Sequence, residues 1–350
     1  MRKKPVAEQV LVVTGASSGL GRAVARRAGV RGAKLVLAAR NEDALDMAVA
    51  EVEAAGGEAL AVAGDLTSPD DVAILVERAL DRFGRIDSVV CSHMVTVYAE
   101  ASQLHEEELR RVFEVNFFSR VRLFQATLPP LAETGGTFVD VNSALAYRGI
   151  PLQAAYCSTK AALRIFLESA RVELQKHGSG VDVCCVLPGA MNTPQFERAR
   201  QRIGFQPQPV PPIYEPEPVA EAVLHCVEHP LRELPVGWGA QKALWAQKLA
   251  PRLADRVLRQ TGWSSQHTGE PKAVDAPDNL FDVIPGDPGA HGRFDGRARP
   301  TTAWTAARLA LRSKPAALGL LGIAAPAAAV VFSQRERNRS HRLGRLVGTR

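Results

Sequence analysis

The sequence predicts an α/β fold in which helices cover both faces of a parallel sheet. Short apolar segments of strand length alternate along the chain with segments of helical periodicity. This alternation is typical of parallel strands joined by crossover helices. Polar residues follow several of the strands, and ligands of such sheets bind at the carboxyl ends of the strands. We therefore expect a doubly wound sheet with a functional site along that edge.

The expected strands are short, mostly apolar runs, each ending at a turn or a polar residue. They are Val10–Val13, Lys34–Ala39, Ala59–Ala63, Asp87–Cys91, Thr137–Asn142, Val181–Leu187 and Glu233–Val236. A first helix follows the glycine turn, Asn41 caps the second, and Ser68-Pro69 opens the third. Further helices are expected after His105 and over Gln153–His177, Val219–Glu228 and Trp238–Arg259.

Three regions of different composition divide the chain. Residues 1–260 carry the strands and helices, with a Pro-rich segment after Thr193 that we expect to form a mobile cover over the site. Residues 261–300 have little apolar periodicity and much Gly, Pro and Asp, which predicts an extended linker or a wrapping arm. Residues 301–350 are basic and rich in Ala, and we expect them to form a helical tail.

The formal net charge of +6 is unevenly distributed over the 350 residues. From Arg293 onward, 12 Lys and Arg side chains stand against two acidic ones, whereas the preceding residues are net acidic. This body has no basic stripe with interleaved aromatic residues, so we expect no nucleic-acid partner. The five cysteines form no CxxC pair and suit reduced thiols in the cytoplasm. His225 and His229 have the spacing of a metal pair, but no third ligand accompanies them, so no metal site is expected.

A glycine-rich turn after the first strand is a candidate pyrophosphate site, because backbone N–H groups and a helix N-terminus can approach an anion there. Its candidate binding residues are Gly15, Ser17, Ser18, Gly19, Leu20 and Gly21. The second strand ends in Arg40, where an acidic residue would bind the ribose 2′-hydroxyl of NAD. Arg40 either pairs with a 2′-phosphate, which favours NADP over NAD, or is a solvated charge. Asp65, after the third strand, either meets the adenine amino group or marks a helix start.

Tyr156 and Lys160 are candidates for proton transfer. Four residues apart on a helix, their side chains share one face, and an ammonium beside a phenol stabilises the phenolate. Ser143, at the end of the fifth strand, can hydrogen-bond the same reacting oxygen. The alternative is a packed ring beside a solvated amine, and the rest of the chain decides between the two.

Taken together, these motifs resemble the short-chain dehydrogenase/reductase family over about Val10 to Val236. The matching residues are Thr14, Gly15, Gly19, Leu20, Gly21, Asp65, Leu66, Asn116, Ser143, Tyr156, Lys160, Pro188, Gly189 and Thr193. The resemblance implies a Rossmann-type fold with about seven parallel strands, and a homodimer or homotetramer. It implies that Tyr156 is the acid/base, that Lys160 binds the nicotinamide ribose and lowers the tyrosine pKa, and that Ser143 orients the substrate oxygen. It also implies that Asn116 holds a relay water.

The family resemblance further implies that the residues after the sixth strand, Pro188, Gly189 and Thr193, border the nicotinamide. One segment departs from the family pattern, because Cys91-Ser92-His93-Met94 stands where the family usually has Asn-Asn-Ala-Gly. Met94 adds bulk beside the cofactor, and Cys91 cannot replace the hydrogen bonds of an amide.

These features predict an NADP-dependent oxidoreductase that interconverts a secondary alcohol and a ketone or other carbonyl compound. The substrate is expected to be a small molecule, in a pocket that looks apolar around Leu145, Ala190 and Met191. The alternative is a catalytically weak dinucleotide-binding protein of the same fold that acts as a sensor or scaffold. The departure at Met94 favours that alternative, and the complete set of catalytic residues opposes it.

Residues 315–332 contain no charged side chain and are flanked by arginines on both sides. As a helix of about 1.5 Å per residue they are just long enough for a hydrocarbon core of ~30 Å. Alanine dominates the segment, and Gly319, Gly322 and Pro326 weaken it further. The segment either associates with a membrane surface, with the catalytic body in the cytoplasm, or docks as a small helix on protein.

Overall fold

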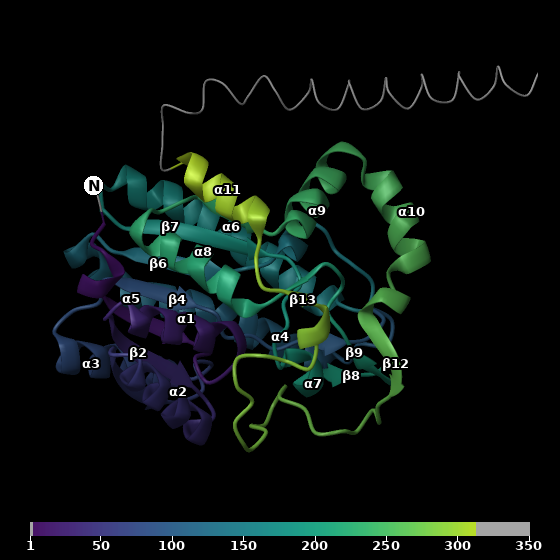
Figure 1. Ribbon diagram of the computed structural model, residues 1–350, viewed down its shortest axis with the longest axis horizontal. Helices are drawn as coiled ribbons and strands as arrows, with labels where there is room; N and C mark the ends of the chain where they lie inside the picture. The colour runs from purple at the N-terminus through teal and green to yellow at the C-terminus, as the bar shows by residue number, and fades with distance from the viewer. Residues whose placement is uncertain (1–2, 313–350) are drawn as a thin grey trace, which may run out of the picture. The chain divides into compact units, whose positions relative to one another are not determined.

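A computed structural model describes residues 3–312 of the chain. Its centre is a seven-stranded parallel sheet with the strand order β11-β7-β6-β4-β1-β2-β3 (Figure 1). The strands are β1 Val10–Thr14, β2 Lys34–Ala39, β3 Glu58–Ala63, β4 Ser88–Cys91, β6 Thr137–Val141, β7 Asp182–Pro188 and β11 Glu233–Val236. The predicted fold class is confirmed, and each expected strand lies within one residue of its predicted bounds.

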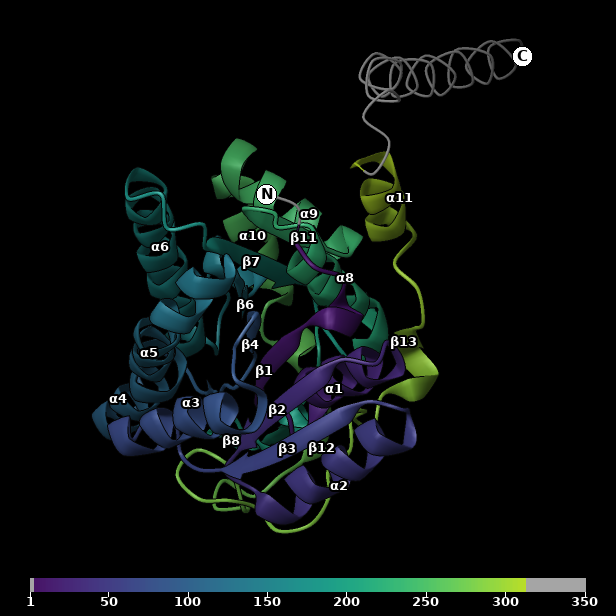
Figure 2. The ribbon, with the colours of Figure 1, turned by 90° about the vertical axis from the view of Figure 1, so that its left-hand side faces the viewer.

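Helices cover both faces of this sheet (Figure 2). One face carries α1 Gly19–Val30, α2 Glu42–Ala54 and α8 Pro216–Glu228, and α1 packs against both of the others. The other face carries α3 Pro69–Phe83, α4 Glu106–Phe113, α5 Ser119–Thr134 and α6 Ala154–Lys176. All residues of β1 and β4 are buried between the two layers of helices, which explains why both strands are almost unbroken runs of apolar residues.

Local signals fix where several helices begin. The Asn41 side chain accepts a hydrogen bond from the backbone N–H of Ala44 at 3.0 Å and caps α2. Ser68 caps α3 in the same way, with Pro69 in its first turn. The helical periodicity over Trp238–Arg259 does not belong to one continuous helix, because Ala250, the residue before Pro251, is not in the helical conformation. The chain instead forms α9 Trp238–Leu249 and α10 Pro251–Thr261.

The segment after α10 wraps along the body, and Met1–Thr302 forms one compact unit. Two small sheets tie it down. In one, β12 His267–Pro271 lies antiparallel to β9 Phe205–Pro207, and in the other β13 Ala298–Arg299 lies parallel to β10 Ile213–Tyr214. These pairings hold the segment after α10 against the rest of the unit. We call residues 261–302 the arm.

Two short elements complete the body: α7 Gln195–Arg198, and a small sheet formed by β5 Val97–Tyr98 and β8 Arg200–Gln201. Beyond the arm, α11 Ala303–Arg312 belongs to a separate unit. Within residues 3–312, no helix is long and apolar enough to cross a membrane. The candidate membrane segment 315–332 lies outside the described residues.

Candidate active site

A cavity of about 910 Å³ opens along the carboxyl ends of the central strands. It is lined by all the predicted site residues except Asn116: Gly15, Ser17, Ser18, Gly19, Leu20, Gly21, Arg40, Asp65, Leu66, Met94, Ser143, Tyr156, Lys160, Pro188, Gly189 and Thr193. The parallel sheet brings these residues together because its strand ends meet at one edge. One cavity thus contains both the candidate phosphate turn and the candidate proton-transfer residues.

The turn between β1 and α1 can hold a pyrophosphate. Gly15 adopts φ +68°, and a Cβ there would lie 2.8 Å from the backbone of His93, so only glycine fits. A Cβ at Gly21 would lie 2.2 Å from the carbonyl oxygen of Gly15. The first turn of α1 leaves N–H groups such as that of Leu20 without intrahelical partners, at the positive end of the helix dipole. Both features suit an anionic dinucleotide.

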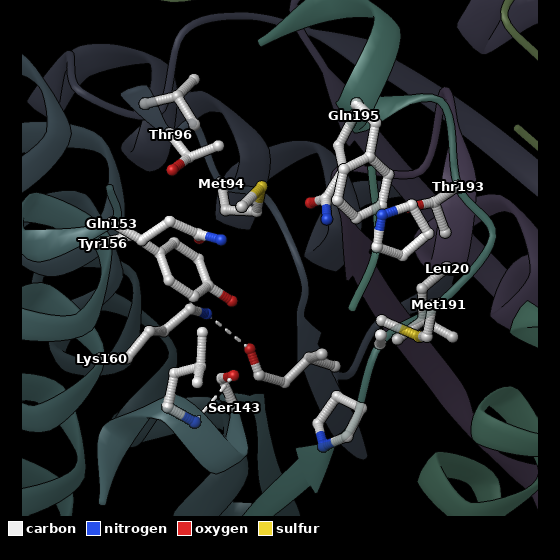
Figure 3. A pocket seen from close by; sticks show the side chains of 18 of the residues that line it. Leu20, Met94, Thr96, Ser143, Gln153, Tyr156, Lys160, Met191, Thr193 and Gln195 are labelled. Atoms are coloured by element: carbon white, nitrogen blue, oxygen red, sulfur yellow. Dashed lines mark hydrogen bonds between the residues drawn. The ribbon is translucent and has the colours of Figure 1, made fainter. Parts of the chain in front are cut away.

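Ser143, Tyr156 and Lys160 lie on one wall of the cavity, with Thr193 and Met191 across from them (Figure 3). Ser143 follows β6, and its Oγ accepts a hydrogen bond from the N–H of Leu145 at 3.1 Å. Tyr156 and Lys160 lie one turn apart on α6. The Lys160 side chain is buried, and its Nζ lies 5.6 Å from the centre of the Tyr156 ring.

The electrostatics of this pair differ from the expectation that Lys160 lowers the pKa of Tyr156. Burial raises the pKa of Tyr156 to about 12, while a hydrogen bond with Ser143 and the charge of Arg120 act in the opposite direction. Burial, followed by repulsion from Arg120, lowers the pKa of Lys160 to about 7. In this structure Lys160 Nζ donates to the carbonyl oxygen of Val141 at 2.8 Å, which explains why Lys160 has little effect on the pKa of the Tyr156 phenol.

Asn116 occupies a different environment from the one expected. It lies in a π-helical turn, Glu114–Phe118, between α4 and α5, and its side chain is completely buried. Its amide exchanges two hydrogen bonds of 2.9 Å with the backbone of Val95 and donates a third to Thr159. The side chain therefore fastens the loop after β4 to the helices. Such π turns are frequent at functional sites.

The unusual Cys91–Met94 segment has its own hydrogen-bond network. The Ser119 hydroxyl donates to the carbonyl of Val115, so it accepts from His93 Nε2 at 2.8 Å. His93 Nδ1 then accepts from the Thr14 hydroxyl at 2.7 Å. Burial keeps the pKa of His93 well below its usual value. His93 is therefore a neutral link between strand ends and α5, and not an acid/base.

The arm crosses the cofactor end of the cavity. Arg40 donates to the carbonyl oxygens of Asn279 at 2.7 Å and Phe281 at 3.0 Å. The N–H of Gly19 donates to the carbonyl oxygen of Gly289 at 3.0 Å. The arm also lines the cavity with Asn279, Val283, Ile284 and Pro288. Sequence reasoning missed these residues, because an irregular segment gives no periodic signal of where it packs.

Asp65 also has protein partners in this region. Its Oδ2 accepts from Arg111 at 2.8 Å, and its Oδ1 accepts from the N–H and hydroxyl of Thr67. The interaction with Arg111 helps to keep the pKa of the Asp65 carboxyl below its usual value, against the effect of burial. The carboxylate is thus ionised and already paired, which leaves less of its hydrogen-bonding capacity for an adenine amino group than expected.

The opposite end of the cavity is apolar. Its walls include Leu145, Ile150 and Met191, together with the Pro-rich segment 209–212. One face of α9 and α10 completes it with Ala243, Ala246, Leu253, Ala254, Val257 and Leu258. Several large apolar side chains around these two helices are exposed, among them Leu249 at 78%. This end therefore suits a bulky apolar molecule.

The model of the family described as short chain dehydrogenase matches residues 9–204. YxnA, an uncharacterized oxidoreductase of Bacillus subtilis (strain 168), is 36% identical over 286 residues, or 81% of this chain and 80% of the relative.

Two solved structures are similar in fold. An alcohol dehydrogenase from the archaeon Thermococcus sibiricus, complexed with 5-hydroxy-NADP, has a TM-score of 0.57 and 30% identity, and the match covers 65% of this chain and 95% of that chain. A short chain dehydrogenase from Mycobacterium paratuberculosis, bound to NAD, has a TM-score of 0.58, covers 67% of this chain and 98% of that chain, and at 24% identity shows the fold alone.

Proposed function

The chain is an NAD(P)-dependent oxidoreductase of the short-chain dehydrogenase family, and from this premise we propose that it interconverts a bulky apolar secondary alcohol and its ketone with NADP(H). The observation that carries the proposal is the single cavity that joins the glycine turn to Ser143, Tyr156 and Lys160. A proton carrier and a dinucleotide cradle at one site are what alcohol oxidation requires.

Each residue of the proton-transfer wall has a separate task. The nicotinamide supplies or accepts the hydride when the cofactor is bound. Ser143 orients the substrate oxygen by a hydrogen bond, and Tyr156 gives that oxygen a proton in reduction or removes it in oxidation. Lys160 holds the nicotinamide ribose. The apolar end of the cavity excludes water from the reacting atoms.

The preference for NADP rests on Arg40. The end of β2 reads Ala38-Ala39-Arg40, without the carboxylate that would bind a ribose 2′-hydroxyl. Of the five N–H groups of the guanidinium, two donate to the arm, so three stay available for a 2′-phosphate. The similar structures carry an NADP derivative in one case and NAD in the other, so the preference depends on this chain's own residues.

A screen for oxidation of NADPH tests the proposal. Bulky apolar ketones of steroid or terpenoid size should be reduced faster than small ketones such as acetone, because only they fill the cavity between α6 and α10. The alternative, a sensor or scaffold, predicts NADPH binding without turnover of any ketone or aldehyde. We also propose that the protein assembles as a homodimer or homotetramer in the cytoplasm, which light scattering and cell fractionation would test.

A further inference from the structure

We infer that Arg120 is a positioning residue for proton transfer, acting as a second, buried cation behind Lys160 and Tyr156. The inference rests on the proposed function, because it concerns the same reaction. Its basis is a carbonyl group that two cations share. Lys160 Nζ donates to the carbonyl oxygen of Val141 at 2.8 Å, and Arg120 Nη1 donates to the same oxygen at 3.1 Å.

Arg120 is held rigidly in the interior. Its side chain, on α5, has no exposed surface. It donates to the carbonyl oxygens of Cys91, at 3.2 Å, and His93, at 3.1 Å, which lie at and just beyond the end of β4. It also forms an ion pair of 2.5 Å with Asp140 on β6, whose side chain is equally buried. These bonds tie the ends of β4 and β6 together, a task that Cys91 cannot perform with its own side chain.

The ion pair extends to the substrate-orienting serine. The second oxygen of Asp140 accepts from Asn142 Nδ2 at 2.7 Å. The other end of that amide, Asn142 Oδ1, accepts from the backbone N–H of Ser143 at 2.9 Å. The chain Arg120–Asp140–Asn142 therefore fixes the backbone of Ser143, while Arg120 itself faces Lys160.

Few other charges face Lys160. The thiols of Cys91 on β4 and Cys185 on β7 are neutral near pH 7, because burial raises the pKa of each, that of Cys91 to about 11. His93 is also neutral, for the reason given above. Arg120 and Asp140 are then the charged groups that act on Lys160 from the neighbouring α5 and β6.

The two charges have opposite effects on the reacting groups. Arg120 disfavours the ammonium of Lys160 and favours the phenolate of Tyr156, so it lowers the pKa of both. Asp140 raises the pKa of both, and its effect is smaller than that of Arg120. The pair as a whole therefore lowers the pKa of both groups. As a result, Tyr156 can deprotonate an alcohol at a less alkaline pH.

Two pH titrations of the full-length protein test this role. The first is the dissociation constant of NADPH, measured by fluorescence from about pH 6 to about pH 10, where affinity should fall as Lys160 loses its proton. The second is the pH dependence of kcat/KM for alcohol oxidation over the same range, which should rise toward alkaline pH as Tyr156 begins to ionise. The pH at which kcat/KM reaches half of its value at about pH 10 serves as the second midpoint. In Arg120→Met both midpoints should move up by about one pH unit or more.

Three variants serve as comparisons. Arg120→Lys keeps the cation and should leave both midpoints close to those of the wild type, although it loses bonds to the strand ends. Arg110→Met removes an exposed arginine from α4 and should change neither midpoint. If Arg120→Met does not fold because Asp140 is left unpaired, Arg120→Met/Asp140→Leu removes both charges, and its midpoints should still move up, by a smaller amount.

Unchanged midpoints in the folded Met variant, or equal shifts in the Met and Lys variants, would show that Arg120 is only a structural link. A wild-type protein that neither binds NADPH nor oxidises any alcohol would instead overturn the proposed function. The two failures are therefore distinguishable.

Discussion

Replacing Arg40 with alanine should make the affinities of the protein for NADPH and NADH nearly equal. The guanidinium has three N–H groups beyond those that reach the arm carbonyls of Asn279 and Phe281. A charge-assisted contact between them and a 2′-phosphate contributes about 1–3 kcal/mol. Its loss corresponds to a weakening of NADPH binding by roughly 5- to 150-fold, since each 1.4 kcal/mol is tenfold.

The same substitution also loosens the arm, and that effect must be separated from the first. Losing the two arm bonds should weaken NADPH and NADH alike, because both cofactors share the adenosine and pyrophosphate. The ratio of the two dissociation constants, measured by fluorescence titration, therefore isolates the 2′-phosphate contact.

Asp287→Asn is the matched control for the arm. It weakens the ion pair between Arg22 and the arm but leaves Arg40 in place. It should change the two constants by the same factor. Equal losses of NADPH and NADH affinity in Arg40→Ala would refute the assignment, and Arg40 would then serve only to hold the arm.

Two further predictions concern the glycine turn and the tail. Gly15→Ala should sharply reduce both NADPH binding and Tm, because its Cβ would meet the backbone of His93, whereas Gly84→Ala, with a similar φ but open space around it, should cost only about 1 kcal/mol. Retained NADPH affinity in Gly15→Ala would contradict the close approach. Deleting Thr302–Arg350 should leave turnover intact, because every residue that lines the cavity lies before Thr302. A shift from the membrane fraction to the soluble one on this deletion would favour a membrane-surface role for 315–332, whereas a full-length protein already wholly soluble at low salt would favour the docked helix.

The strands and the glycine turn could be predicted because their signals are local. Val10–Thr14 is continuously apolar since both faces of the sheet are covered, and the parallel order then places the residues that follow each strand at one edge. The break before Pro251 was not predicted, because a proline does not always end a helix: α5 continues through Pro129 and Pro130.

Other features depend on partners far away in the sequence. Asn116 bonds to the backbone of Val95, and the arm reaches Arg40 from residues almost 240 positions later, so neither arrangement leaves a periodic trace. The role of His93 can be assigned only from the structure, which shows that the Ser119 hydroxyl donates to Val115 and that the Thr14 hydroxyl lies beside His93 Nδ1. The Arg120–Asp140 pair cannot be predicted from the sequence for the same reason, because its two residues lie on different elements.

The most direct test of the account is turnover by Tyr156→Phe. The substitution keeps the ring that packs in the cavity and removes only the hydroxyl that exchanges the proton. We predict that turnover of any active alcohol or ketone falls by at least ~10²–10⁴-fold while the dissociation constant of NADPH stays nearly unchanged. Substantial residual turnover in that variant would contradict the assignment of Tyr156 as the acid/base.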